Sequence, residues 1–148
     1  MNRSALRLLV AVVCVSGGSA LAPVSGADGA PVEPMKTWQG EIRLDLRAEA
    51  PKDDYVADKA AWEKLRKSYC PKEKAPEIDF AKDLVLIALN KDPNRISIGA
   101  HLGADGNLTV RHVSTKIAFQ NPTTCKYQFA VIPREGIKSI NGKPLGGK

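Results

Sequence analysis

The stretch Asp83-Leu-Val-Leu-Ile-Ala-Leu-Asn90 decides the fold of this chain. It contains the longest apolar run outside the N-terminus, and the turn-forming sequence Lys91-Asp-Pro-Asn94 follows it directly. A run this short, with Val85 and Ile87 among its leucines, is typical of a strand buried on both faces, because a buried helix would need more length. We therefore expect the rest of the chain to pack around this strand.

The residues on either side of the run predict a mainly antiparallel sheet of about five or six strands. Residues 38–47 alternate apolar and polar side chains, which is the pattern of a strand with one face in water. Residues 95–102 and 107–116 predict a hairpin, because turn-forming residues lie between them at 103–107. One more strand is predicted over residues 125–132.

One helix is predicted over residues of about 58–69, where Asp58 can cap the first turn and Pro71 follows the last. An apolar stripe packs this helix on the sheet, so the predicted fold class is α+β. The stripe and the tight turn at 76–80, which Asp79 can cap, supply the expected structural anchors: Trp62, Leu65, Tyr69, Asp79 and Phe80. Trp62 is expected to be a core residue rather than a ligand-stacking one.

Residues 1–27 have the pattern of a secretory signal peptide. Arg3 and Arg7 supply its positive start, residues 8–15 form a compact apolar segment, and small residues lead to a cleavage site before Asp28. This pattern predicts a secreted or periplasmic protein whose mature chain has no integral membrane segment.

The mature chain is predicted to have a flexible linker at residues 28–37 and a single domain at residues 38–148, because Pro and Gly are frequent in the first segment. Removing Arg3 and Arg7 leaves 20 basic and 16 acidic side chains, a net charge of +4 with the two signs interspersed. Aromatic residues make up only 5% of the sequence, which provides no stacking platform for nucleic acid.

The mature chain keeps two of the three cysteines, Cys70 and Cys125, because Cys14 leaves with the signal peptide. Export to an oxidising compartment makes a Cys70–Cys125 disulfide the expected state, worth about 4 kcal/mol in the chain-entropy model. Two free thiols and an intermolecular bridge are the alternatives.

Two histidines are the obvious metal or acid–base candidates, and their placement depends on the register of the predicted hairpin. A three-residue turn at 105–107 puts His101 and His112 on opposite faces, whereas a two-residue turn puts both on one face. The first register pairs apolar with apolar side chains, so we expect no metal site.

Carboxylates gather near the turn before the central strand, at Glu77, Asp79 and Asp83. Acid–base work would need a cleft around them, and a turn cap with two solvated neighbours is the simpler interpretation. The sequence has no phosphate-binding glycine loop, nucleophile elbow or paired-cysteine metal motif. We therefore expect a protein that is not an enzyme and has no cofactor. Asn107-Leu-Thr109 fits the N-glycosylation pattern.

From residue 60 to residue 133 the chain resembles the C-terminal domain of the protease complex subunit PrcB family. The matching pieces are Trp62-Glu-Lys-Leu65, Pro76-Glu-Ile-Asp-Phe80, Leu84-Val-Leu-Ile87 and Val131-Ile-Pro133. The resemblance implies an exported bacterial protein that accompanies a protease complex. One departure is that Asn94-Arg-Ile-Ser97 stands where many members have a Gly-Gly-Tyr motif.

These observations predict an exported, non-catalytic interaction module that assists a protease or another envelope protein. A small secreted inhibitor or ligand-binding protein is the alternative, and a hydrolase is a weaker one. The expected interaction surface lies on two loops, at Lys91, Asp92, Asn94, Arg95, Gln120 and Asn121. Residues 117–124 form the second loop, in which Ile117 and Phe119 are expected to reach the core.

Overall fold

The computed structural model of the chain describes residues 29–72 and 76–146. The predicted signal peptide, its cleavage site and Cys14 lie outside the described residues. Within them the fold is α+β, as predicted from the sequence, with two mostly antiparallel sheets and one main helix.

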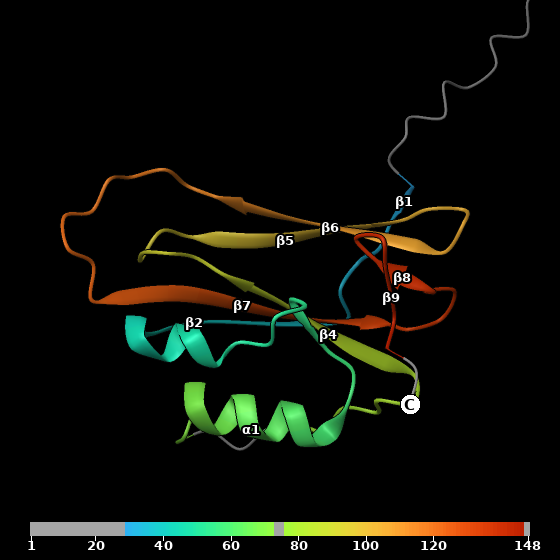
Figure 1. Ribbon diagram of the computed structural model, residues 1–148, viewed down its shortest axis with the longest axis horizontal. Helices are drawn as coiled ribbons and strands as arrows, with labels where there is room; N and C mark the ends of the chain where they lie inside the picture. The colour runs from blue at the N-terminus through green and yellow to red at the C-terminus, as the bar shows by residue number, and fades with distance from the viewer. Residues whose placement is uncertain (1–28, 73–75, 147–148) are drawn as a thin grey trace, which may run out of the picture.

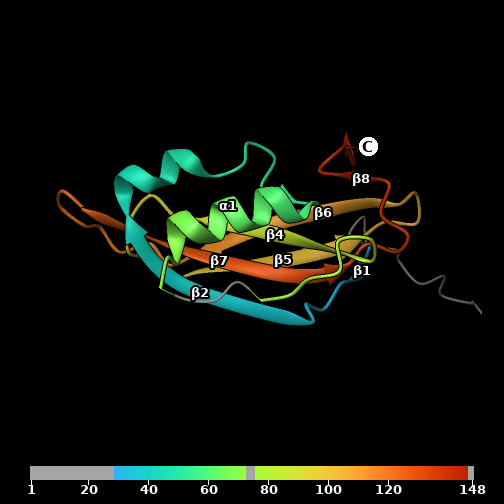
Figure 2. The same ribbon diagram turned by 90° about the horizontal axis from the view of Figure 1, so that it is seen from below.

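Three layers stack on one another (Figure 1). The outer sheet has the strand order β1 (Ala30–Pro31), β5 (Ile96–Leu102), β6 (Asn107–Ser114), β8 (Ser139–Ile140) and β9 (Lys143–Pro144). The middle sheet has the order β2 (Lys36–Arg43), β7 (Thr124–Pro133), β4 (Asp83–Leu89) and β3 (Tyr55–Val56). The third layer contains α1 (Lys59–Tyr69) and the 3-10 helix η1 (Leu44–Glu49), which cover the free face of the middle sheet (Figure 2).

Strand β4 is buried on both faces, which confirms the interpretation of residues 83–90. Leu84 and Leu86 point into a core between the two sheets, and Val85 and Ile87 point into a second core under the helix. All four side chains are at most 1% exposed. Alternate residues of one strand therefore enter both cores, since successive side chains of a strand point to opposite faces.

The prediction of a single sheet is wrong, because the hairpin of β5 and β6 folds over β4 instead of pairing beside it. The connection at residues 90–95 carries the chain from the middle sheet to the outer one. Ala100 of β5 and Leu108 of β6 then cover the face of β4 that the helix does not reach.

Helix α1 has the predicted position, and its cap and apolar stripe are confirmed. The Asp58 side chain accepts a hydrogen bond from the Ala61 backbone N–H at 2.8 Å. Trp62, Leu65 and Tyr69 are 2%, 3% and 6% exposed. The structure therefore supports the interpretation of Trp62 as a core residue.

The tight turn before β4 is also as predicted. The Asp79 carboxylate accepts a hydrogen bond from the Ala81 backbone N–H at 3.1 Å, and the Asp79 carbonyl accepts one from Asp83 at 2.8 Å. Phe80 is partly buried against the core under the helix.

Residues 30–37 are not the predicted linker. Ala30 and Pro31 pair with β5, the Met35 backbone N–H donates to the Val131 carbonyl at 2.8 Å, and β2 begins at Lys36. The predicted strand at 38–47 also ends early, because Leu44 begins η1. Leu44 and its neighbour Leu46 still pack on the core, so the apolar spacing that suggested a strand serves a 3-10 helix instead.

The β5–β6 hairpin has a register that differs from both predicted ones, with Leu102 opposite Leu108. Four residues, 103–106, form the turn, and Gly106 has a φ of +86°, which glycine adopts without strain. His101 pairs with Thr109 and His112 pairs with Ile98. Paired residues share a face of the sheet, so His101 lies on the face of Thr109. Thr109 and His112 are three positions apart on β6, and side chains alternate along a strand. The two imidazoles therefore lie on opposite faces, as the preferred register had implied.

The predicted Cys70–Cys125 disulfide is not formed in the structure, where both residues are buried free thiols. Cys70 follows the last residue of α1, and its Sγ lies 2.7 Å from Tyr127 Oη, in a contact where either group can donate. Cys125 belongs to the same core from β7. The phenol of Tyr127, which crosses Gly40 of β2, therefore provides the hydrogen-bonding partner of the Cys70 thiol.

Candidate functional site

The two predicted interaction loops lie at the same end of the molecule, at the left of Figure 1. Residues 90–95 connect β4 to β5, and residues 115–123 connect β6 to β7, so both loops cross between the two sheets. The structure therefore brings together loop residues that lie more than twenty positions apart in the sequence.

Asn94 joins the two loops. It is 4% exposed, and its Nδ2 donates to the Ile117 carbonyl at 2.8 Å. Its Oδ1 accepts from the Ile117 backbone N–H at 3.1 Å and from the Thr115 hydroxyl at 3.2 Å. The Asp92 carboxylate accepts from the Asn94 backbone N–H at 2.8 Å and so forms a turn within the first loop.

Backbone hydrogen bonds tie the loops to the sheets and to η1. Thr115 donates to the Arg95 carbonyl at 3.1 Å, and Lys126 donates to the Asp92 carbonyl at 3.2 Å. Leu44 donates to the Thr123 carbonyl at 2.9 Å. Together with the contacts of Asn94, these hydrogen bonds hold the loops in one arrangement, so the surface that they form is organised in advance of any binding.

Three large apolar side chains are exposed on one continuous segment of this end. Val113 is 63% exposed, Ile117 62% and Phe119 45%. The expectation that Ile117 and Phe119 reach the core is wrong, because Asn94 holds the backbone of Ile117 and leaves its side chain in solvent. We call residues 91–95 and 113–121 the loop-end surface.

The loop-end surface is basic as well as apolar. The sequence has no Asp or Glu from Gly106 to Arg134. Lys91, Arg95 and Lys116 are exposed, and Asp92 is the one acidic residue of the surface. Gln120 and Asn121 are exposed at its rim. A surface of this kind favours a partner that offers both apolar groups and carboxylates.

Replacing Asn94 with alanine should lower the free energy of unfolding by about 1–3 kcal/mol, because the polar groups of the Ile117 backbone lose their partners. The amides of residues 115–121 should also exchange faster with deuterium. Urea denaturation and hydrogen–deuterium exchange measure the two effects.

The control for this variant is Gln120→Ala, whose exposed side chain should change stability by less than about 0.5 kcal/mol. Equal effects of the two substitutions would contradict the assignment of Asn94 as the residue that joins the loops.

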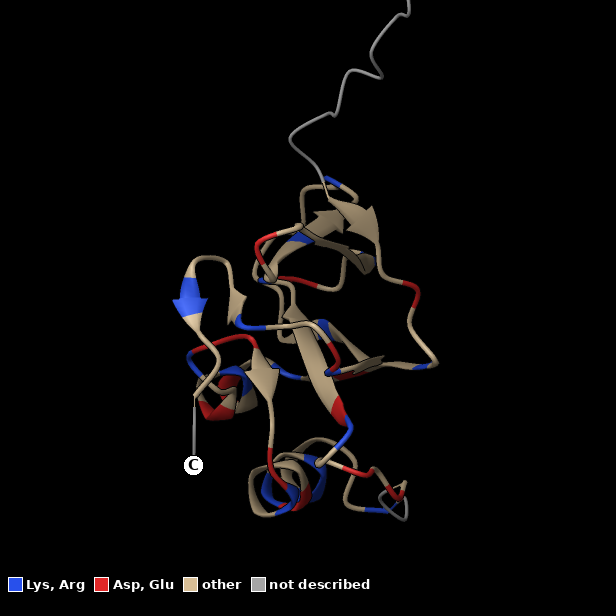
Figure 3. Ribbon diagram, turned by 90° about the vertical axis from the view of Figure 1, so that its right-hand side faces the viewer, with Lys and Arg blue, Asp and Glu red and all other residues tan. Residues whose placement is uncertain are grey.

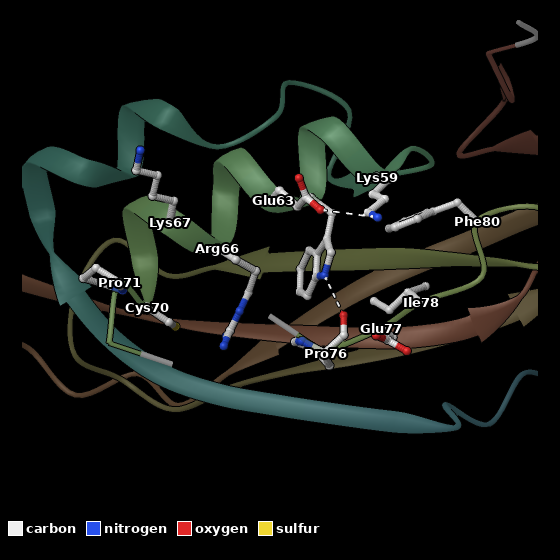
Figure 4. Close-up of a pocket in the computed structure, with 11 residues that line it drawn as sticks. Lys59, Glu63, Arg66, Lys67, Cys70, Pro71, Pro76, Glu77, Ile78 and Phe80 are labelled. Atoms are coloured by element: carbon white, nitrogen blue, oxygen red, sulfur yellow. Dashed lines mark hydrogen bonds and ion pairs between the residues drawn. The ribbon is translucent and has the colours of Figure 1, made fainter. Parts of the chain in front are cut away.

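A recess of about 630 Å³ lies between α1 and residues 76–80 (Figure 4). Trp62 Nε1 donates to the Pro76 carbonyl at 3.4 Å, and Ile78 and Phe80 line the opposite side. Arg66 points into the recess from α1, 2% exposed, with its guanidinium carbon 5.7 Å from the centre of the Trp62 ring. This arrangement is a cation–π contact.

Sequence reasoning did not single out Arg66. Figure 3 colours the charged residues of the chain by sign. Helix α1 carries four basic residues and one acidic residue, Glu63, and Arg66 is one of the basic ones. The one available signal is its position four residues after Trp62, a spacing that puts the two side chains on the same helix face.

Tyr69 is a buried titratable group in the core under the helix. Burial raises its pKa to about 12, with smaller contributions from the negative charges of the Cys125 thiolate and Glu49, and Arg47 acts in the opposite direction. Burial also raises the pKa of the Cys125 thiol. Among the described residues, no group hydrogen-bonds to Tyr69 Oη.

The free energy of unfolding should fall as the pH rises from about 10 toward 12. The Tyr69 phenol ionises near pH 10 in the unfolded chain and only near pH 12 in the folded one, so its stabilising effect is complete below pH 10 and is lost above it. Tyr69→Phe should show a smaller decline over this range. Denaturant titrations of both proteins from pH 7 to pH 11 measure the difference, and identical profiles would contradict the pKa of Tyr69.

The candidate acid–base residues are not brought together. Asp79 caps its turn and Glu77 borders the recess beside α1, while His112 of β6 lines a different recess, next to η1. Within residues 29–72 and 76–146, no three His, Cys, Asp or Glu side chains form a group that could hold a metal ion. No helix in the same residues has the length and apolar character needed to cross a membrane.

Comparison with known proteins gives no match to a family model, to a curated protein or to a solved structure. The resemblance to the PrcB family therefore stays a prediction.

Proposed function

We propose that this protein is an exported, non-catalytic module that binds another protein through the loop-end surface. The observation that carries this proposal is the exposure of Val113, Ile117 and Phe119 on a segment that Asn94 holds in place. Exposed apolar side chains grouped on an ordered surface are typical of protein–protein contact sites.

The charge of the surface indicates the chemistry of the partner. With Lys91, Arg95 and Lys116 around the apolar side chains, the partner should present an apolar recess bordered by Asp or Glu. A protease or another envelope protein with such a recess fits the predicted export of the chain.

The test is a pull-down from envelope extract with the purified protein and a variant that carries Ile117→Ser and Phe119→Ser. The unmodified protein should recover one stoichiometric partner, and the double variant should lose it, because two exposed anchors are removed without changing the core. Met35→Ser is the matched control, since Met35 is 53% exposed and lies on another part of the molecule.

A partner that the double variant binds as well as the unmodified protein would contradict the proposal. Loss of binding in the Met35→Ser control would do the same. Binding of the unmodified protein to anionic phospholipid vesicles, lost in the double variant, would assign the loop-end surface to a membrane instead.

The recess beside α1 favours a second function, the binding of a small apolar carboxylate. Its volume lies in the range of small-molecule sites. Three basic residues and two acidic ones line it beside its apolar residues, so the lining is net positive: Lys59, Arg66, Lys67, Glu63 and Glu77. Titration with octanoate should then change the tryptophan fluorescence saturably, and Ile78→Asp should abolish the change by repelling the carboxylate. An absent or unsaturable change would eliminate this function.

A further inference from the structure

In the part of the chain that the structure describes, the outer edge of β6 is open at the C-terminal end of the strand. Strand β8 pairs only with Asn107 and Leu108, at the beginning of β6, whereas β6 continues to Ser114. His112 and Ser114, the two residues of this end whose backbone groups face outward, are exposed. An unpaired strand edge of this kind is a template on which another extended chain can add.

The hydrogen bonds of β6 show which of its backbone N–H and C=O groups point away from β5. The Val110 N–H donates to Asn141 Oδ1 at 2.8 Å, and the Leu108 carbonyl accepts from the Asn141 N–H at 2.8 Å, so even-numbered residues point their polar groups away from β5. By the same alternation, the N–H and C=O of His112 and the N–H of Ser114 point outward. Among the described residues, no group hydrogen-bonds to them.

The opposite edge of the same sheet is closed. Strand β1 pairs with the end of β5, and Val32 donates to the Ala100 carbonyl at 2.9 Å. Further along, the buried side chain of Gln128 accepts a hydrogen bond from the Ile98 N–H at 2.8 Å. The outer sheet can therefore extend beside residues 110–114 of β6 but not beside β5.

A recess of about 550 Å³ lies next to the open edge. It is formed by η1, the end of β4 and the inner face of β6, and its lining residues include Leu44, Arg47, Asp54, Leu89, Lys91 and His112. Two of these side chains, Arg47 and Lys91, are basic, and one, Asp54, is acidic. An added strand would point alternate side chains toward this recess, where a carboxylate would find opposite charge.

We propose that the open edge of β6 accepts an extended, acidic segment of a partner protein as an added strand that continues the line of β8. This inference rests on the proposed function and deepens it, because the recess shares Lys91 with the loop-end surface. Backbone hydrogen bonds to His112 and Ser114 would supply the affinity, and Arg47 and Lys91 would select carboxylate side chains.

The test uses a phage-displayed library of random ten-residue peptides, selected on the full chain. The selected peptides should carry Asp or Glu at alternate positions, and synthetic copies should bind with measurable heat in titration calorimetry. His112→Pro should weaken them at least about tenfold, because proline removes the outward N–H while the ladder to β5 remains.

Two variants show whether the effect belongs to this edge. His112→Ala keeps the backbone N–H and should retain most of the affinity. Gln39→Pro removes an outward N–H from β2, the edge strand of the other sheet, and should leave affinity unchanged. If circular dichroism shows that His112→Pro is unfolded, Ser114→Pro takes its place. This variant removes the next outward N–H, at the end of the strand.

A library that yields no binder, or binders that His112→Pro and Ser114→Pro do not weaken, would overturn the proposal. A self-associated wild-type protein that His112→Pro converts to a monomer would also overturn it, because the occupant would be a second copy. Selected peptides should still bind the variant with Ile117→Ser and Phe119→Ser. The peptide experiment therefore tests strand addition at β6, and the pull-down separately tests partner binding through the loop-end surface.

Discussion

Replacing Trp62 with alanine is expected to lower the free energy of unfolding by about 3–5 kcal/mol, the range for a buried aromatic residue in a core. The indole is 2% exposed and lies edge-on to Phe129, with ring centres 5.2 Å apart. It also contacts Trp38, at 6.1 Å, and the Arg66 guanidinium. Because single domains have a total stability of about 5–15 kcal/mol, this loss would remove much of it.

Trp62→Phe is the control for this variant, since it keeps a ring against Phe129 but loses the hydrogen bond from Nε1 to Pro76. Its loss should be clearly smaller than that of the alanine variant. Urea denaturation measures both losses. It is monitored by circular dichroism, because the substitutions themselves change the tryptophan fluorescence. A loss below about 1 kcal/mol for Trp62→Ala would place Trp62 on the surface and contradict the packing of α1 on the sheet.

Leu86→Ala and Ile87→Ala should each lower the free energy of unfolding by about 2–5 kcal/mol. The two residues are neighbours on β4, yet Leu86 enters the core between the sheets and Ile87 enters the core under the helix. Both are at most 1% exposed. In a single sheet covered by one helix, one of the two would face water and its replacement would have little effect.

Ser97→Ala is the control for the pair, because Ser97 is an exposed residue on the outer face of β5 and its replacement should cost less than about 0.5 kcal/mol. Chemical denaturation of the three variants gives the comparison. A large loss for Ile87→Ala with a negligible loss for Leu86→Ala would contradict the three-layer arrangement.

Sequence patterns predicted the elements whose signals are local. The apolar run at 84–89 is short and flanked by charge and turn residues, so its burial on both faces follows from its own composition. The helix has a cap at Asp58 and a stripe at Trp62, Leu65 and Tyr69, all within a few turns. Neither inference needs knowledge of a distant contact.

The second sheet depends on long-range pairing, and for that reason it was not predicted. Alternation in residues 95–102 is the same whether this strand pairs beside β4 or folds over it. A signal was nevertheless present: if β4 is buried on both faces and one helix covers only one of them, Leu84 and Leu86 require a second layer.

The loop-end surface shows the same limit at the level of single side chains. The positions of Lys91, Arg95, Gln120 and Asn121 in loops could be predicted from turn residues. The exposure of Ile117 and Phe119 could not, because it depends on the hydrogen bonds that Asn94 makes across more than twenty residues. An apolar residue in a loop gives no local sign of whether it is buried or presented to a partner.

The most direct measurement is hydrogen–deuterium exchange of the protein alone and in complex with the partner recovered by the pull-down. Binding through the loop-end surface should slow exchange in residues 91–95 and 113–121, and leave residues 59–71 and 76–80 around the α1 recess unchanged. Protection confined to the α1 recess, with unchanged exchange at residues 91–95 and 113–121, would contradict the proposal that this protein acts through the loop-end surface.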